Sequence, residues 1–433
     1  MELARTHLDI ATLRRAVIGV SGIYAFGIPL TLLANILLAR FLSVEEFGIY
    51  GVALSLVSVL SIPLVAGMPS LLTREVAGYV QSGALAAYRG ITNSAYQWVL
   101  GLSAVFLGVG GGLILMRPEG DPYRALAIAL LLLPLLGMNA VRSGIMKGLG
   151  YPVLSEAPTQ LLQPVLLLVG FLGLQLVGVI SVRTALLWYL CANLIVFSVA
   201  FWLLIRRQPS GIAGVRADYC ERPRWIRAVL PFAATNAVWT LTAHLAILML
   251  GMFGQTEAAA AMRVAERGAM LISLPLMFVN ATIGPHVVAS YRGGESEKLA
   301  KTVQYGGRMA AICAVPVALV LMAFGLFLIS ITFGSAYADI AYRPMLVLVA
   351  AQTASVLLGP AGVVLMMTGR EKANLAIQIV GLAVFAVTAF LLIPPFGAVG
   401  AAIGAGSGIL LSSILAFMEV RRKLGFPSWG FQA

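Results

Sequence analysis

An uncharged and mostly apolar run, VIGVSGIYAFGIPLTLLANILL, occupies residues 17–38, shortly after Arg14 and Arg15. A helix rises about 1.5 Å per residue, so about 20 such residues cross the hydrocarbon core of a bilayer. The run is too long for the apolar core of a secretory signal, and it lacks a small-residue cleavage site. We therefore expect residues 17–38 to form the first transmembrane helix.

Similar runs recur along the whole chain of 433 residues, which is 60% hydrophobic and 11% charged, with a mean hydropathy of +0.95. At about 20 residues per span plus a connection, the chain accommodates about twelve spans and no large soluble domain. The predicted spans cover residues 17–38, 48–70, 92–115, 124–140, 159–180, 185–205, 229–252, 258–284, 306–331, 344–367, 373–393 and 397–418. The fold class predicted is an all-α polytopic membrane protein.

The chain has 29 Lys and Arg residues against 17 Asp and Glu residues, for a net charge of +12, and the basic residues fall mostly in the loops between these runs. If the N-terminus is cytoplasmic, 22 of the 29 lie on the cytoplasmic side, and the seven others are Arg40, Arg117, Arg124, Arg183, Arg263, Arg267 and Arg343. An excess of Lys and Arg marks cytoplasmic loops. The pattern predicts a multi-pass inner-membrane protein with both termini in the cytoplasm. It explains the positive charge without nucleic acid as a partner.

A repeat with a constant offset of 212 residues relates the two halves of the chain. It pairs Phe41 with Phe253, Glu45 with Glu257, Val52-Ala53 with Val264-Ala265, Ser61 with Ser273, Pro63-Leu64 with Pro275-Leu276, and Tyr79 with Tyr291. Both copies have the same orientation, and parallel repeats are typical of alternating-access transporters. We predict two parallel six-helix lobes, residues 1–205 and 229–433, joined by a basic cytoplasmic linker at 206–228. Chance alignment of apolar helices is the alternative.

Ionisable side chains within a span are candidates for function because they are costly in lipid. The densest group is Arg263, Glu266 and Arg267, whose spacing places them on one helix face. Guanidinium groups bind phosphate oxygens in bidentate fashion, and a nearby carboxylate can take up a coupling cation. The group predicts a binding site for an anionic head group, with Glu266 as the ion-coupling residue. The alternatives are a structural ion pair between helices, or side chains that lie shallow enough in the membrane to snorkel outward.

Six further residues are candidates for the lining of a substrate cavity. They are Arg74 and His286 at equivalent repeat positions, Arg142 after span 124–140, His244 with Trp239 five residues before it, and Asn280. Imidazole and amide groups can hydrogen-bond sugar hydroxyls, and the basic residues can meet a head group. For the basic residues the alternative is anchoring at the membrane interface, and for the others it is packing between helices.

The sequence contains no motif for nucleotide binding, nucleophilic catalysis or metal binding. No phosphate-binding glycine loop, Ser/His/Asp set or zinc motif is found. Cys191, Cys220 and Cys313 are widely separated, which predicts neither a disulfide framework nor a metal site. We therefore expect a protein that is not an enzyme and has no cofactor, and that uses a proton or sodium gradient rather than ATP.

The segment LARFLSVEEFGIY at residues 38–50 resembles the sequence after the first helix of the bacterial polysaccharide transporter family, in the multidrug/oligosaccharidyl-lipid/polysaccharide exporter superfamily. Four further segments are also similar to that family: KGLG at 147–150, AMRVAER at 261–267, FGSAY at 333–337 and FGAVGAA at 396–402. The resemblance implies a MATE-like fold and a flippase for an undecaprenyl-diphosphate-linked oligosaccharide of O-antigen or exopolysaccharide synthesis. Its implied partners are the lipid-linked oligosaccharide, membrane lipid and other membrane proteins of polysaccharide assembly.

Two other functions compete with this interpretation. A cation-coupled multidrug exporter of the same fold needs acidic residues within its spans, and Glu266 is the main carboxylate that the predicted spans contain. A membrane enzyme that polymerises or ligates lipid-linked sugars commonly has a long outer loop with catalytic arginines, whereas the predicted outer loops are all short. The sequence therefore favours a transporter of an anionic substrate.

Overall fold

The computed structural model describes residues 10–115, 121–209 and 211–429, which are almost entirely helical and contain no strand. The first elements are α1 (Ile10–Phe41), α2 (Val44–Leu60), α3 (Ile62–Val65), α4 (Met68–Ser82), α5 (Leu85–Leu115), α6 (Asp121–Leu130), α7 (Leu132–Gly148), α8 (Pro152–Ala157), the π-helix η2 (Pro158–Leu162), α9 (Gln163–Leu176) and α10 (Val182–Arg207). There follow the 3-10 helix η3 (Ile212–Gly214), α11 (Arg222–Met252), α12 (Thr256–Arg292), α13 (Ser296–Thr332), α14 (Ser335–Leu357), α15 (Ala361–Met367) and α16 (Glu371–Leu424). The predicted all-α class is confirmed; Arg117 of the predicted outer loops lies outside the described residues.

Ten helices in the described part of the chain are long and apolar enough to cross a membrane, and α2 together with α3 and α4 makes an eleventh candidate. The 54 residues of α16 would extend about 80 Å as one straight helix, far beyond the roughly 30 Å of a bilayer core. Gly397, which follows Pro394 and Pro395, has non-helical backbone angles (φ 54°, ψ −126°), so α16 comprises two spans. Counted in this way, the described residues hold the twelve spans that were predicted.

The second span is bent by 42° between α2 and the α3–α4 segment. Pro63 lies in the first turn of α3, and Gly67 before α4 has a left-handed backbone (φ 76°). A Cβ at Gly67 would also lie 2.6 Å from the backbone nitrogen of Ala233 and 2.8 Å from the carbonyl oxygen of Val229. The turn from α3 into α4 therefore depends on glycine at position 67, both for its backbone conformation and for its contact with α11.

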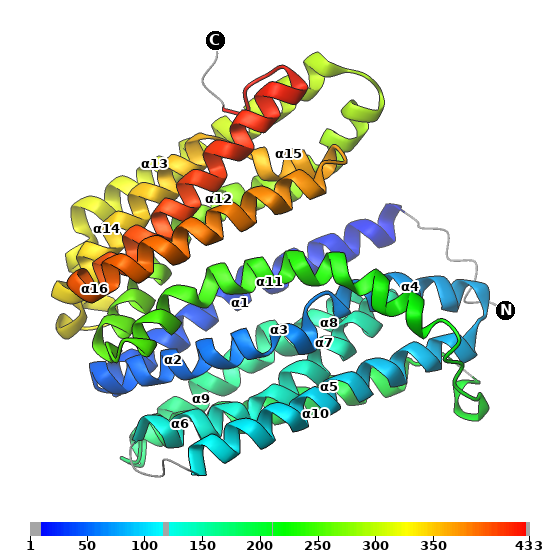
Figure 1. Cartoon of the computed structure of the whole chain (residues 1–433), viewed down its shortest axis with the longest axis horizontal. Helices are drawn as coiled ribbons and strands as arrows, with labels where there is room; N and C mark the ends of the chain where they lie inside the picture. The colour runs from blue at the N-terminus through cyan, green and yellow to red at the C-terminus, as the bar shows by residue number, and fades with distance from the viewer. Residues whose placement is uncertain (1–9, 116–120, 210, 430–433) are drawn as a thin grey trace. The chain divides into compact units, whose positions relative to one another are not determined.

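The chain forms two compact units that are discontinuous in sequence (Figure 1). Unit 1 comprises Met1–Leu42 and Leu56–Thr240, and unit 2 comprises Ser43–Ser55 and Leu241–Ala433. Both α2 and α11 thus contribute residues to each unit. The predicted lobe boundaries stay a prediction; by their contacts, the basic segment 206–228 and the first part of α11 belong to unit 1.

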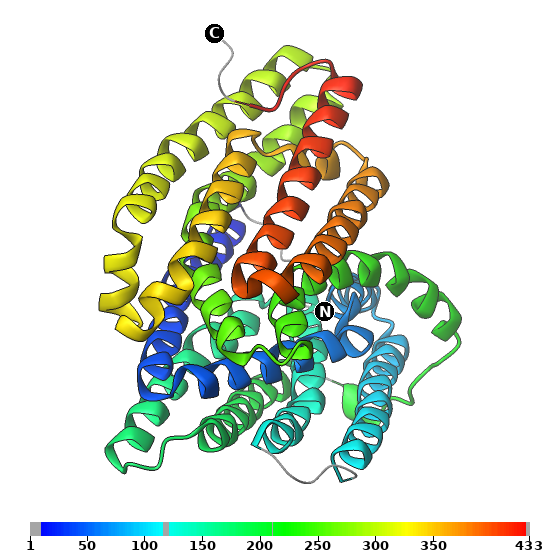
Figure 2. The ribbon, with the colours of Figure 1, turned by 60° about the vertical axis from the view of Figure 1, so that its left-hand side comes forward.

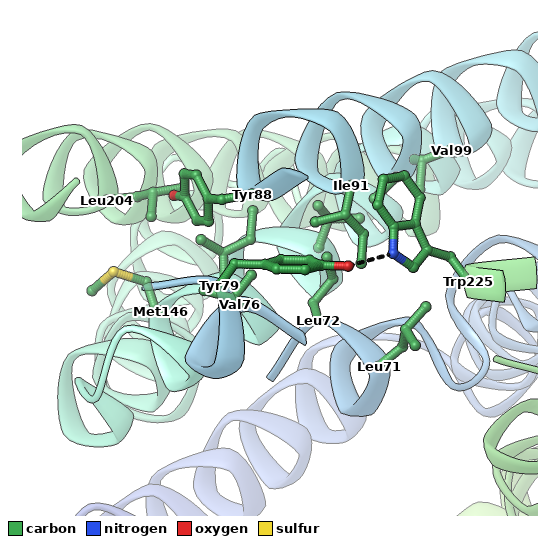
Figure 3. Packing of buried hydrophobic residues seen from close by; sticks show 13 residues of the cluster. Leu71, Leu72, Val76, Tyr79, Tyr88, Ile91, Val99, Met146, Leu204 and Trp225 are labelled. Carbon is green, nitrogen blue, oxygen red and sulfur yellow. Dashed lines mark hydrogen bonds between the residues drawn. The ribbon is translucent and has the colours of Figure 1, made fainter. Parts of the chain in front are cut away.

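In unit 1, α7 packs against α4, α5, α8 and α10, so that it lies at the centre of this unit. An apolar cluster of α4, α5 and α7 residues surrounds two polar side chains, Tyr79 and Trp225 (Figure 3). The indole nitrogen of Trp225 donates to the Tyr79 hydroxyl at 2.8 Å, and that hydroxyl donates to Oε2 of Glu221 at 2.7 Å. These bonds attach the start of α11 to α4.

The basic segment before α11 is docked on α5. Nη1 of Arg89 donates to the carbonyl oxygens of Val215 and Ile212 at 2.5 and 3.2 Å. The backbone N–H of Asp218 donates to the carbonyl oxygen of Ala86 at 3.0 Å. The segment that was predicted to be a linker is therefore held to unit 1 by backbone contacts.

In unit 2, α12, α13 and α14 pack against one another, and α16 packs on α14 and α15. Figure 2 shows α13, α14 and α16, in yellow to red, side by side. The two parts of α16 approach closely at Gly381, where an added Cβ would lie 2.9 Å from the carbonyl oxygen of Gly408. Small residues at such crossings allow helices to pack tightly in lipid, where apolar burial gives little driving force.

Candidate functional site

The charged face of α12 lies near the start of this helix, in unit 2. Residues 259–265 are all buried, including Arg263 with 8% of its surface exposed, whereas Glu266 and Arg267 are partly buried. Glu257 in the first turn is favourable next to the partial positive charge of the helix N-terminus. A guanidinium in so enclosed a place requires compensating contacts.

Two aromatic residues of α2 supply such contacts to Arg263. Its guanidinium carbon lies 5.3 Å from the ring centroid of Phe47 and 5.2 Å from that of Tyr50. Both rings are buried, and Phe47 packs edge-on against Tyr337 of α14, with the centroids 5.9 Å apart. Cation–π attraction is stronger when the pair is shielded from water. We call Arg263, Phe47 and Tyr50 the arginine cradle.

Glycines of α2 make room for this arrangement. A Cβ at Gly51 would lie 3.3 Å from both Cδ and Nη1 of Arg263, and one at Gly48 would overlap the carbonyl oxygen of Thr256. With the offset of 212 residues, Gly51 is the repeat equivalent of Arg263. The second repeat thus places an arginine side chain where the first repeat leaves space.

His244 of α11 lies in the same unit as the arginine cradle. Its Nδ1 is 3.4 Å from the hydroxyl oxygen of Ser55, and its side chain is within electrostatic range of Arg263 and Arg267. The structure therefore brings one predicted site residue from another helix towards the charged face of α12.

Asn280 and His286 share α12 with Arg263, but they lie far along it. At about 1.5 Å per residue, Asn280 is roughly 25 Å and His286 roughly 35 Å from Arg263 along the helix. Oδ1 of Asn280 is buried without a hydrogen-bond partner among the described residues, and His286 is exposed. These two residues are not part of the group around the arginine cradle.

The remaining predicted site residues, Arg74, Trp239 and Arg142, belong to unit 1. Nε and Nη2 of Arg74 donate to Oε1 of Glu75 at 3.0 and 2.8 Å, and its guanidinium lies 5.7 Å from the ring centroid of Phe232. Trp239 is 63% exposed, whereas Arg142 is completely buried. These three residues were predicted to line one cavity, but their surroundings in the structure are very different.

Sequence reasoning missed two kinds of residue. Phe47 and Tyr50 lie within the segment that carries the family resemblance, but nothing in the segment indicates that they face an arginine 213 or more positions away. Glu75 and Glu156 are buried carboxylates that fell outside the predicted spans, because α4 and α8 extend the helical structure beyond the apolar runs. Within the described ranges, no cluster of three His, Cys, Asp or Glu residues could hold a metal ion.

A family model described as "Polysaccharide biosynthesis protein" matches residues 14–287, which is more than half of the chain. The chain belongs to the polysaccharide biosynthesis protein family. The matched region of this polysaccharide biosynthesis protein includes the whole arginine cradle. It confirms the relationship that the segments at 38–50 and 261–267 indicated. A search of the curated proteins finds no significant match to the sequence.

Solved structures show the same fold. An inward-facing multidrug resistance MATE family transporter of the MOP superfamily is 17% identical, with a TM-score of 0.76 over 95% of this chain and 98% of that one. The lipid II flippase MurJ is 11% identical, with a TM-score of 0.71 over 93% and 87% of the chains. A MOP superfamily transporter from Pyrococcus furiosus is 17% identical, with a TM-score of 0.65 over 98% and 97%. The MATE-like, two-lobed fold of the polysaccharide biosynthesis protein is thereby confirmed.

Proposed function

We propose that this polysaccharide biosynthesis protein is a flippase, which moves an undecaprenyl-diphosphate-linked oligosaccharide to the periplasmic leaflet by alternating access. The observation that carries the proposal is Arg263, a buried cation of an apolar helix that Phe47 and Tyr50 enclose. The family supplies the link to polysaccharide synthesis, and MurJ, a relative in fold, is by its name a flippase of a lipid. O-antigen and exopolysaccharide precursors are the substrates of this class that we consider.

The chemistry of the α12 face suits a diphosphate head group. Arg263 and Arg267 provide two planar guanidinium groups one turn apart, and each can bind phosphate oxygens through two parallel N–H bonds. The ring stacking fixes Arg263 in position, so little side-chain entropy is lost when an anion binds. His244, within electrostatic range of both arginines, can hydrogen-bond the first sugar or a phosphate oxygen.

A multidrug exporter is the second candidate, because a multidrug resistance MATE transporter shares the fold. Such a protein requires carboxylates that can hold cationic drugs. The buried carboxylates Glu75 and Glu156 both lie beside basic residues, with Arg74 at 2.8 Å and Lys147 at 2.6 Å. These two carboxylates are already neutralised, and Glu266 lies on one helix face with Arg263 and Arg267, so the charges favour an anionic substrate over a cationic drug.

A membrane polymerase or ligase of lipid-linked sugars is the third candidate, and it would make the protein an enzyme. The family match and the structural relatives favour a transporter instead, and the protein needs no catalytic group for this role. Transfer of glycan by the purified protein would establish the enzymatic alternative.

Deletion of the protein in its bacterium tests the proposal directly. We expect surface polysaccharide to be lost and a lipid-linked oligosaccharide to accumulate, because synthesis continues on the cytoplasmic side without translocation. Both are measured by glycan electrophoresis and by mass spectrometry of extracted lipids, with a plasmid-borne copy as the control that restores them. Unchanged glycans together with new sensitivity to cationic drugs would instead support the multidrug exporter.

For the topology, we propose an inner-membrane protein with both termini in the cytoplasm. Reporter fusions after Gln208 and Lys423 are expected to be active as cytoplasmic reporters, and those near Asp121 and Asp339 as periplasmic reporters. The reason is the 22-to-7 division of Lys and Arg between the two sides. Paired alkaline phosphatase and green fluorescent protein fusions measure this, and a periplasmic C-terminus would contradict an even number of spans.

For the energy source, we propose a proton or sodium gradient, with Glu266 as the coupling residue. Glu266 lies on the same helix face as both arginines, so that its protonation or the binding of a cation changes the charge of the site. Membrane lipid and other membrane proteins of polysaccharide assembly are the partners expected of such a flippase.

A further inference from the structure

A second buried arginine, Arg142, lies at the centre of unit 1. It is 0% exposed and belongs to α7, which is surrounded by α4, α5, α8 and α10. A guanidinium remains protonated under all physiological conditions. The charge of Arg142 is therefore present in the interior of the unit and requires compensation.

The hydrogen bonds of Arg142 compensate its charge only in part. Nε donates to Oδ1 of Asn139 at 2.9 Å, and Nη2 donates to the carbonyl oxygen of Ser155 at 3.1 Å. Both acceptors are neutral. Nη1 is buried and has no hydrogen-bond partner among the residues that the structure describes. Buried charges in proteins are usually paired, because an unpaired one costs several kcal/mol.

The carboxylate that acts on Arg142 is Glu156 of α8, but its oxygens are already engaged. Oε1 lies 2.6 Å from Nζ of Lys147, and Oε2 accepts a hydrogen bond from the hydroxyl of Tyr24 at 3.1 Å. Two cations, Arg142 and Lys147, thus share one carboxylate. The cluster carries one more positive charge than negative charge.

Tyrosines of α5 present further donors beside Arg142. The hydroxyl of Tyr96 is buried without a partner in the described part of the chain, and α5, which carries Tyr96, packs against α7, which carries Arg142. The hydroxyl of Tyr88, two turns earlier on α5, is likewise buried without a described partner and is within range of Tyr96. Unused donors and excess positive charge thus coincide between α5 and α7.

We propose that Arg142 and Tyr96 bind a small inorganic anion of the chloride class inside unit 1. A water molecule could accept hydrogen bonds from Nη1 of Arg142 and from the Tyr96 hydroxyl, but it would leave the excess positive charge uncompensated. A monovalent anion satisfies the donors and neutralises the cluster together. The site is separate from the arginine cradle of unit 2 and goes beyond the proposed flippase function, since its role is to complete the packing of α5, α7 and α8.

Thermal unfolding of the detergent-purified protein tests this site without any substrate. We expect the Tm of the wild type to be higher in sodium chloride than in sodium gluconate of equal ionic strength and pH, by on the order of 5 °C at saturating chloride. Arg142→Met, which keeps an unbranched apolar stem but removes the guanidinium and its charge, should abolish this difference. Tyr96→Phe should reduce it.

Arg224→Met is the matched control, because Arg224 is an exposed arginine of the same unit that pairs with Glu221 at 3.0 Å. It should retain the full chloride response. Equal stability of the wild type in both salts, or an undiminished response in Arg142→Met, would overturn the proposal. If Arg142→Met fails to fold, anomalous diffraction from bromide-soaked wild-type crystals decides: density beside Arg142 supports the site, and its absence rejects it. Neither result depends on whether the protein flips lipids.

Discussion

Arg263→Ala is expected to abolish export of the polysaccharide while the protein remains inserted in the membrane. The substitution removes the guanidinium that Phe47 and Tyr50 hold at 5.3 and 5.2 Å. Truncation of one member of a buried charge interaction costs about 2–5 kcal/mol, which lowers substrate affinity by about 30-fold or more. The measurement is surface glycan in the deletion strain complemented with the variant, normalised to the amount of protein in the membrane.

Arg263→Lys separates the charge from the shape of the group. Lysine keeps the positive charge but replaces the planar fork by a point charge, so we expect partial rescue. Arg292→Ala is the control, because Arg292 lies in the last turn of the same helix and is exposed. It should export normally. Full glycan output from Arg263→Ala at normal abundance would remove Arg263 from the proposed site.

Glu266→Gln is expected to uncouple transport from the ion gradient. In proteoliposomes that contain a fluorescent lipid-diphosphate sugar, flipping by the wild type should accelerate under an imposed proton or sodium gradient. The amide of glutamine is uncharged and takes up no proton at neutral pH, so it binds cations only weakly. The variant should therefore lose most of this acceleration. Separate proton and sodium gradients identify the ion.

Glu257→Gln is the matched control for this experiment, because Glu257 is an exposed carboxylate in the first turn of α12. It should respond to the gradient like the wild type. If Glu266 serves only to neutralise the arginines, Glu266→Gln will change the affinity for the lipid and keep its gradient response, which assigns coupling to another residue. Flipping that ignores every gradient would argue against active transport altogether.

The helical class and the number of spans were predictable because lipid imposes a simple rule. A backbone in the bilayer must satisfy its own hydrogen bonds, so each apolar run of about 20 residues becomes a helix. The breaks were less predictable. Gly397 divides α16 into two spans where the sequence shows two prolines and a glycine, but the left-handed turn at Gly67, between α3 and α4, depends on how closely α11 approaches.

For the site, the sequence showed which ionisable side chains have a high free energy of transfer into lipid, and the structure showed what surrounds them. Arg263, Glu266 and Arg267 were recognisable because their helical spacing places them on one face in an apolar run. Arg74 and Arg142 looked alike in the sequence. In the structure, Arg74 pairs with Glu75, Lys147 pairs with Glu156, and Arg142 has only neutral hydrogen-bond acceptors.

By itself, then, the sequence of this polysaccharide biosynthesis protein determined its helices, its internal repeat and its charged helix face, since these follow from periodicity and from the transfer free energy of side chains. Only the tertiary structure decided that Phe47 and Tyr50 enclose Arg263 and that Arg142 lacks a carboxylate of its own. Such contacts join residues of different helices. They depend on how helices cross and where glycines let them approach, and spacing along a single chain contains little information about either.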